Sequence, residues 1–239
     1  MRLIVLVLGL VVGGIMGCTR PPDYAIVLAG NSIVANREDE PFDEALETAL
    51  PAALHAARVP GRAAVTANIA NYGGLTSRML IRDSGGVARS YQATKPTVLL
   101  VYEGSNDLWH LLQIGGPEVG LQAYHNLKQY CTNCKAQFPR LLIVTGTVLP
   151  RTDMPQPAVF EQQRLVLNEQ LRQAWHRREP WLDGLADPAS QPAMQHPSGT
   201  GAPSRYYKDG VHPSRVGLDE IAPLFAQAVG TALAQVSPR

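Results

Sequence analysis

Two short segments at opposite ends of the chain carry the side chains of a serine nucleophile and its base. The first is Gly30-Asn31-Ser32, and the second is Asp209-Gly210-Val211-His212. A serine hydroxyl becomes nucleophilic when a neutral imidazole accepts its proton, and a carboxylate then fixes the tautomer of that ring and stabilises its cation. Because Asp209 and His212 are three residues apart, one turn of chain can bring the carboxylate against the ring. We therefore predict a catalytic triad of Ser32, His212 and Asp209.

Two further segments offer hydrogen-bond donors for a negatively charged oxygen. One contains Gly74, in a glycine-containing stretch that exposes backbone amides, and the other, Gly104-Ser105-Asn106-Asp107, contains a side-chain amide. Acyl transfer passes through a tetrahedral intermediate whose oxyanion needs such donors. We predict an oxyanion hole formed by the backbone amides of Ser32 and Gly74 and by the side chain of Asn106.

Each of these segments, taken alone, also has a structural explanation. A serine after a strand, such as Ser32, is a common helix N-cap, and Asp209-Gly210 is a common turn. Asp107 is expected to cap the helix that follows it and to take no part in catalysis. The occurrence of all four segments in one chain favours the catalytic interpretation.

Alternating strand and helix patterns surround these segments. Short apolar runs predict strands at 24–29, 63–69, 97–102, 141–147 and 181–185, and helical spacing predicts helices at 41–58, 117–138, 159–178 and 214–236. Pro51 is expected to kink or split the first helix. The alternation predicts an α/β fold, a three-layer α/β/α sandwich around a mostly parallel five-stranded sheet. Three of the four segments follow a predicted strand directly, at the carboxyl edge where such sheets bind ligands.

Together, the four segments resemble the sequence blocks of the SGNH hydrolases, also called the GDSL lipase/esterase family. The family is named for its Ser, Gly, Asn and His, which correspond in order to Ser32, Gly74, Asn106 and His212. Gly-Ser-Asn-Asp is similar to the family's Gly-x-Asn-Asp block, and the residues from Asp209 onward are similar to its Asp-x-x-His-Pro block. The resemblance implies a flavodoxin-like fold and a serine hydrolase that cleaves carboxylic esters through an acyl-enzyme on Ser32. It implies no cofactor and no metal.

One position differs from the family pattern, and another position of the pattern can be matched to either of two glycines. The family's first block is usually Gly-Asp-Ser, and here Asn31 replaces the aspartate; asparagine keeps the size and the local hydrogen bonding but loses the charge. The oxyanion glycine is either Gly73 or Gly74, and Gly74 aligns better with the family's Gly-x-Thr stretch.

Two alternative functions remain compatible with the same blocks. One is an O-acetyl transferase or deacetylase that acts on cell-envelope polysaccharide, and the other is a non-catalytic binding lipoprotein, favoured only by Asn31. The absence of a long insertion favours an open cleft and short-chain esters, whereas the fold and the triad are also compatible with carbohydrate or lipid esters. The expected substrate is therefore a small-molecule, lipid or glycan ester.

The N-terminal residues have the pattern of an export signal. A single positive charge at Arg2 precedes an apolar run that is short for a membrane span, and Ile15-Met16-Gly17-Cys18 resembles the lipobox of bacterial lipoproteins. The resemblance implies removal of residues 1–17 and a lipid anchor on Cys18; the alternatives are a plain signal peptide with a chance cysteine and an uncleaved anchor. Thr19 follows the cysteine, which favours the periplasmic face of an outer membrane. We expect residues 18–239 to form a single domain and to be monomeric.

The remaining composition limits other functions. Lys and Arg number 21 and Asp and Glu number 20, so no basic stripe is available for nucleic acid. Cys131 and Cys134 form a lone C-x-x-C motif late in a predicted helix, and in an exported protein we expect a local disulfide. Only His125 lies near them in sequence, so we expect no metal. The other histidines and tryptophans are expected to be surface or packing residues. Trp109 is singled out because the loop after the third predicted strand borders the site, and a place for His110 in the same cleft is left open.

Overall fold

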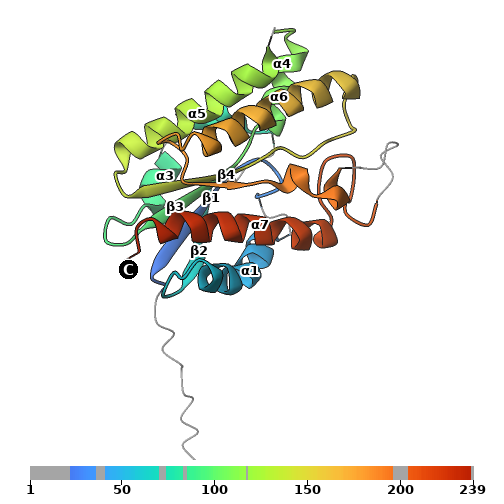
Figure 1. Cartoon of the computed structure of the whole chain (residues 1–239). Helices are drawn as coiled ribbons and strands as arrows, with labels where there is room; N and C mark the ends of the chain where they lie inside the picture. Colours follow the sequence, from blue (N-terminus) through green and yellow to red (C-terminus); the bar gives the residue numbers. More distant parts are fainter. Residues whose placement is uncertain are drawn as a thin grey trace, which may run out of the picture.

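Five parallel strands form one sheet in the order β2-β1-β3-β4-β5 (Figure 1). They are β1 (Tyr24–Gly30), β2 (Ala63–Asn68), β3 (Thr97–Tyr102), β4 (Leu141–Gly146) and β5 (Gly184–Ala186). Every residue of β1, β3 and β4 is buried, as expected for parallel strands that are covered on both faces. The strand order is that of a flavodoxin-like sheet, in which ligands bind where the order reverses, between the carboxyl ends of β1 and β3.

The computed structural model describes residues 22–35, 41–69, 74–82, 85–116, 118–195 and 204–237, and all structural statements concern these residues. The expected signal peptide, the lipidation site at Cys18 and the alternative glycine Gly73 lie outside them. No helix within the described ranges is long and apolar enough to cross a membrane.

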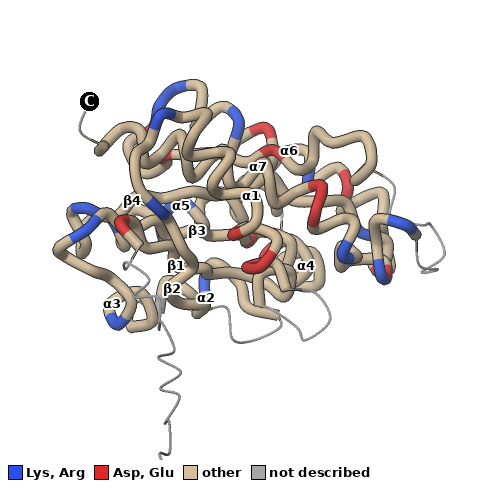
Figure 2. Tube along the Cα trace, turned by 90° about the horizontal axis from the view of Figure 1, so that it is seen from below, with Lys and Arg blue, Asp and Glu red and all other residues tan. Residues whose placement is uncertain are grey.

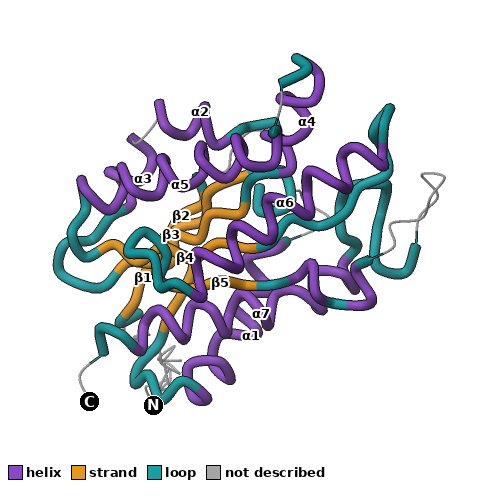
Figure 3. The backbone as a smooth tube through the Cα atoms, turned by 45° about the horizontal axis from the view of Figure 1, so that its top comes forward, coloured by secondary structure: helices purple, strands orange, loops and turns teal. Residues whose placement is uncertain are grey.

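Helices cover both faces of the sheet (Figure 3). One face carries α1 (Phe42–Ala56) and α7 (Arg215–Ala234), and the other carries α2 (Ser77–Arg82), α3 (Gly85–Ser90), α4 (Ser105–Gln113), α5 (Val119–Gln137) and α6 (Pro157–His176). The predicted three-layer α/β/α sandwich is confirmed.

The alternation of side chains along the strands divides the interior into two cores. In β1, Ile26 and Leu28 contact the core under α1 and α7, whereas Val27 and Ala29 contact the core under the other five helices. Successive residues of a strand point to opposite faces of the sheet, so an uninterrupted apolar strand supplies both cores at once.

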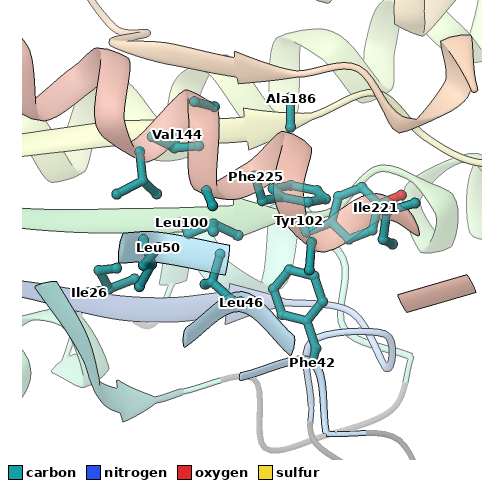
Figure 4. Close-up of a cluster of buried hydrophobic side chains, with 14 of the residues drawn as sticks. Ile26, Phe42, Leu46, Leu50, Leu100, Tyr102, Val144, Ala186, Ile221 and Phe225 are labelled. Atoms are coloured by element: carbon teal, nitrogen blue, oxygen red, sulfur yellow. The ribbon is translucent and has the colours of Figure 1, made fainter. Parts of the chain in front are cut away.

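An aromatic cluster holds α1 and α7 against the carboxyl end of β3 (Figure 4). The ring of Phe225 lies 5.3 Å from that of Phe42 and 4.9 Å from that of Tyr102, both edge to face. Such pairs contribute about 0.5–1.5 kcal/mol each beyond the area that they bury. The cluster therefore fixes the helix that follows His212 relative to the strand that precedes Asn106.

Ion pairs join the surface helices to neighbouring loops. Lys128 pairs with Glu179 at 2.6 Å, and Lys135 pairs with Asp183 at 2.8 Å. Figure 2 shows that, in the described part of the trace, charged residues of both signs occur around the molecule.

The expected strands agree with the structure more closely than the expected helices do. The first four strands match within about a residue, but the fifth begins only at Gly184, because Trp181 and Leu182 are buried before the strand starts. The helix through Pro51 is not split and runs unbroken over Phe42–Ala56. Helices α2 and α3 were not predicted, and α4 was expected only as a helix after Asp107 without bounds, because at six to nine residues these helices are too short to show a clear helical period.

The composition of residues 188–204, rich in Pro, Ser, Gly and Gln, predicts a surface loop, and for the described part of the segment this prediction is partly wrong. It begins with two 3₁₀ turns, Pro188–Ser190 and Pro192–Met194. Met194 is fully buried in the core under α1 and α7. The stretch 196–203 lies outside the described residues.

The expected disulfide between Cys131 and Cys134 is wrong in this structure. Both residues are buried free thiols within α5. Residues three apart on a helix have their Cβ atoms about 5–6 Å apart, whereas a disulfide needs about 3.8 Å. Burial also raises the pKa of both thiols, that of Cys134 to about 11, so the pair acts as apolar packing.

Candidate active site

Ser32, His212 and Asp209 form one hydrogen-bonded chain. Oγ of Ser32 lies 2.8 Å from Nε2 of His212, and Nδ1 of the same ring lies 2.8 Å from Oδ2 of Asp209. The serine comes from the loop after β1, and the other two residues come from the loop before α7, so segments 180 residues apart meet here. The structure brings together the three residues that the sequence analysis selected, with the ring between hydroxyl and carboxylate.

The turn before Ser32 depends on a glycine. Gly30 has φ +132°, and a Cβ added there would lie 2.2 Å from the carbonyl oxygen of Tyr102. That carbonyl accepts a hydrogen bond from the backbone N–H of Asn31 at 3.0 Å. The close approach of β1 to β3 therefore requires glycine, and it turns the chain so that half-buried Ser32 follows the strand directly.

Asn31 performs the local bonding expected of this position. Its side chain is buried, and Oδ1 accepts the backbone N–H of Ile33 at 3.0 Å. An aspartate would accept the same bond through an equivalent oxygen. The absence of charge at Asn31 therefore leaves the turn intact.

Two backbone hydrogen bonds fix the carboxylate of Asp209. Its Oδ1 accepts the N–H groups of Val211 and His212, both at 2.7 Å. Partial burial acts to raise the pKa of Asp209, but the hydrogen bonds from His212 and Val211 outweigh it, so the pKa is lowered from 3.8. The carboxylate is therefore ionised at neutral pH and is oriented before any substrate arrives.

The loop that carries Asp209 and His212 is held by the segment after β4. The backbone N–H of Thr152 donates to the carbonyl of Gly210 at 2.9 Å, and a Cβ on Gly210 would lie 2.6 Å from the Thr152 hydroxyl. At its end, the loop joins α7, where the Ser214 side chain accepts the N–H of Gly217. These contacts fix both ends of the loop.

Asn106 links the loops that follow β2 and β3. It is the second residue of α4, and its Nδ2 donates to the carbonyl of Leu75 at 2.8 Å. An amide group has two N–H donors, so this bond leaves one for an oxyanion. Gly74 precedes Leu75, is exposed, and has φ +84°. Ser32, Gly74 and Asn106 therefore follow three neighbouring strands at one edge of the sheet.

Asp107 has a structural role, but a different one from that expected. It does not cap its own helix; its Oδ2 accepts the backbone N–H of Ser77 at 2.7 Å and the Ser77 hydroxyl at 3.0 Å. Burial raises the pKa of Asp107 in spite of these bonds. The residue joins the start of α2 to α4, beside Asn106.

Glu103 and Arg151 are residues near the site that the sequence analysis missed. Glu103 is fully buried, its Oε1 accepts the N–H of Gly104 at 2.9 Å, and its Oε2 has no hydrogen-bond partner among the described residues. Burial, together with the nearby Asp107, raises the pKa of Glu103 well above 4.5. The available signal was a charged residue at the end of an uninterrupted apolar strand.

Arg151 lies in the segment after β4 and connects to the start of α4. Its Nη1 donates to Oγ of Ser105 at 3.1 Å, and Asp153 binds the same guanidinium through two bonds of 2.7 and 2.6 Å. Only 9% of the Arg151 side chain is exposed. The signal that could have identified it was the polar run Arg151-Thr152-Asp153 a few residues after the fourth predicted strand. The bond to Ser105 fixes the residue next to Asn106.

Trp109 and His110 both lie on α4, the helix that carries Asn106. Trp109 packs partly buried on α4, with its ring 4.9 Å from that of His110. No group of three or more His, Cys, Asp or Glu side chains within the described ranges is arranged to hold a metal ion.

Comparison with known proteins gives one family match and several similar solved structures. Residues 28–219 match the GDSL-like lipase/acylhydrolase family. The chain is also similar to a lipase/acylhydrolase from Enterococcus faecalis, with 18% identity, 87% of this chain and 95% of that chain covered, and a TM-score of 0.60. A second similar structure is the lipase Lip_vut3 from a goat rumen metagenome, with 17% identity, coverage of 86% and 96%, and a TM-score of 0.57. None of the curated protein sequences matches the chain.

Proposed function

Since the chain belongs to the GDSL-like lipase/acylhydrolase family and is an ester hydrolase, we propose that it cleaves carboxylic esters through an acyl-enzyme on Ser32. The observation that carries this proposal is the distance of 2.8 Å between Oγ of Ser32 and Nε2 of His212. A ring nitrogen at this distance is placed to accept the hydroxyl proton. The oriented carboxylate of Asp209 on the other nitrogen holds the ring in the tautomer that can accept it.

In the first half of the reaction, Oγ of Ser32 attacks the ester carbonyl carbon while Nε2 of His212 takes the hydroxyl proton. The carbonyl oxygen becomes an oxyanion, held by the N–H groups of Ser32 and Gly74 and the side chain of Asn106. Asp209 stabilises the imidazolium. The bond between the carbonyl carbon and the alcohol oxygen then breaks, and His212 gives its proton to the departing alcohol.

In the second half, water replaces the alcohol. His212 takes a proton from the water while the water oxygen attacks the acyl carbon, and a second oxyanion forms in the same site. The bond to Ser32 then breaks, the proton returns to Oγ, and a carboxylic acid leaves. The whole cycle requires only groups that belong to the chain and one water molecule.

A lipid anchor on Cys18 is part of the proposal. Its support is the sequence Ile15-Met16-Gly17-Cys18 after a short apolar run. Two acyl chains provide a stable membrane anchor. The site would then act on esters at the periplasmic face of an outer membrane. Mass spectrometry of the N-terminal peptide from membranes tests this directly, because an unmodified peptide that starts at Met1 would contradict it.

The catalytic assignment is tested by ester hydrolysis with the purified full-length protein. We expect release of p-nitrophenol from p-nitrophenyl acetate, and Ser32→Ala should lower kcat by roughly 10⁴- to 10⁶-fold. Ser90→Ala is a matched control, since the Ser90 hydroxyl donates to the Gly86 carbonyl within α3. Equal activity in the wild type and Ser32→Ala would contradict the proposal.

A further inference from the structure

The loops that precede the five strands form a surface opposite the active site. All strands are parallel, so these loops lie at one edge of the sheet, which we call the amino edge (Figure 1). Ser32 and Asn106 follow strands and lie at the other edge. The loops of the amino edge comprise residues 22–23, 57–62, 91–96, 138–140 and 177–183. The mechanism described above uses none of them.

Five basic side chains of the amino edge have no acidic partner. They are Arg58, Lys95, Arg140, Arg177 and Arg178. The four arginines are exposed, and none of the five forms an ion pair within the described part of the chain. They come from four separate loops, so no long basic run marks them in the sequence.

The acidic residues of the same loops do not cancel this charge. Glu179 and Asp183 are paired with lysines of α5, the first with Lys128 at 2.6 Å and the second with Lys135 at 2.8 Å. Asp23 is the third acidic residue in these loops. The amino edge is therefore positively charged, although the whole chain has a net charge of only +1. A surface of this charge attracts an anionic partner.

The proposed lipid anchor attaches beside this edge. Nζ of Lys95 donates to the carbonyl of Pro22 at 2.9 Å, and the hydroxyl of Tyr24 lies 3.1 Å from that of Ser237. These contacts hold the start of β1 at the amino edge. Cys18 precedes Pro22 by four residues, a length of chain that spans at most about 14 Å. An anchor on Cys18 therefore keeps the amino edge close to the surface of the bilayer.

The same tether keeps the active site away from that bilayer. Strand β1 has seven residues, from Tyr24 to Gly30, and its carboxyl end lies about 20 Å from its start at ~3.3 Å per residue. Ser32 lies beyond that end. A tether of about 14 Å is shorter than this separation, so the molecule cannot turn over and place Ser32 against the bilayer that holds the anchor.

We propose that the amino edge docks on anionic phospholipid headgroups of the anchoring bilayer, so that the active site acts on esters in the aqueous space and not on lipids of that bilayer. The inference rests on the proposed lipid anchor and on the proposed function of Ser32, and it specifies the substrate class of that site. The anchor alone leaves the molecule free to tilt. Basic residues near an anionic membrane surface are attracted to it, and this attraction selects the edge that faces the membrane.

Fluorescence quenching by brominated phosphatidylcholine tests the docking with the full-length lipidated protein in vesicles that also contain phosphatidylglycerol. Trp175 and Trp181 lie at the amino edge, whereas Trp109 lies on α4 at the catalytic edge. The quenched fraction of the emission should therefore increase in Trp109→Phe and decrease in Trp175→Phe. Raising the salt from about 0.1 M to about 1 M shortens the Debye length from ~10 Å to ~3 Å, so the quenching should fall.

A double variant tests the charge. Each basic residue at an anionic membrane surface contributes about fivefold to binding, so Arg177→Gln/Arg178→Gln should lower the ratio of docked to undocked protein about 25-fold. Arg205→Gln/Arg215→Gln is the matched control, because it removes two exposed arginines from the loop before α7 and from the start of that helix. Both lie at the catalytic edge, so the ratio should not change. Thermal unfolding verifies that each variant folds.

The location of one ester tests the substrate class. p-Nitrophenyl hexadecanoate is placed either in the vesicles that carry the protein or in separate vesicles without protein. A site that faced its own bilayer would meet the ester of that bilayer at an effective concentration raised by about 10²-fold or more. We expect equal rates in the two arrangements, or no hydrolysis in either, together with hydrolysis of dissolved p-nitrophenyl acetate.

The outcomes separate the docking from the proposed function. Much faster hydrolysis of the ester in the protein's own vesicles would overturn the inference and leave the Ser32 mechanism intact. A quenched fraction that falls in Trp109→Phe, or that Arg177→Gln/Arg178→Gln leaves unchanged, would also overturn it. Absence of p-nitrophenyl acetate hydrolysis would overturn the proposed function of Ser32, and the quenching would still decide whether the amino edge faces the membrane.

Discussion

Asp209→Asn is expected to inactivate the site by reversing the tautomer of His212. Oδ1 of Asp209 accepts the N–H groups of Val211 and His212, both at 2.7 Å, while Oδ2 lies 2.8 Å from the ring Nδ1. In the variant, the two backbone donors require the amide oxygen, so the NH₂ group must face Nδ1. Nδ1 then has to accept a hydrogen bond, and the ring proton moves to Nε2, which lies 2.8 Å from Ser32.

The size of the effect follows from this reversal. A ring protonated on Nε2 cannot accept the Ser32 proton, and loss of the correct tautomer in such triads lowers kcat by about 10⁴-fold, or about 5.5 kcal/mol. KM should change little, because Asp209 is not placed against substrate. Steady-state hydrolysis of p-nitrophenyl acetate measures both constants.

The control for this variant is Asp219→Asn. Asp219 is 56% exposed on α7 and pairs with Arg215, so its loss should leave kcat unchanged. A loss of less than tenfold in Asp209→Asn, with thermal unfolding like that of the wild type, would refute the argument from the two backbone bonds. A large rise in KM at constant kcat would also refute it.

Three further predictions follow from the residues around the site. Glu103 has a raised pKa in the folded state, so folding favours its protonated form and the free energy of unfolding decreases as the pH rises above 4.5. Glu103→Gln removes this loss, so it should raise the unfolding temperature at pH 8 relative to the wild type, and the difference should vanish at pH 4. Gly30→Ala should cost more than ~3 kcal/mol of unfolding free energy by denaturant titration, whereas Gly115→Ala, at φ +71° with open space in the described structure, should cost about 1–2 kcal/mol. Asn106→Ala should lower kcat about 10²- to 10³-fold by removing an oxyanion donor, and a loss confined to KM would argue against that role.

The sheet could be predicted from sequence because its strands are apolar throughout. The run from Val98 to Val101 has no interruption, and in the structure each residue contributes to one of the two cores. Burial on both faces leaves little choice of residue. The same strength of pattern is absent from α2 and α3, which have six residues each and show less than two helical turns.

The site could be predicted in part because its chemistry depends on residue type and order. Ser32, Asp209 and His212 were selected from the sequence, and the structure brings their side chains together. The residues that hold the loops around these three side chains could not be selected from residue type and order. Glu103 and Arg151 act through contacts with Gly104 and Ser105, and the contact of Arg151 depends on how the segments after β3 and β4 pack together.

The disulfide expected between Cys131 and Cys134 is a prediction that the structure contradicts. C-x-x-C in a chain expected to be exported predicted a disulfide, but the sequence also placed both residues in a helix, and the helix geometry decides the outcome. In the structure both thiols are buried in α5 and are not joined by a disulfide. Local backbone geometry is therefore a better guide than the spacing motif here.

Labelling with a fluorophosphonate probe tests the central claim most directly, because only a serine activated by its neighbours reacts with it. We predict one label per chain on the full-length protein, located by peptide mass spectrometry on Ser32, and no label on Ser32→Ala. Labelling of another residue, or equal labelling of the wild type and Ser32→Ala, would contradict the assignment of Ser32 as the nucleophile.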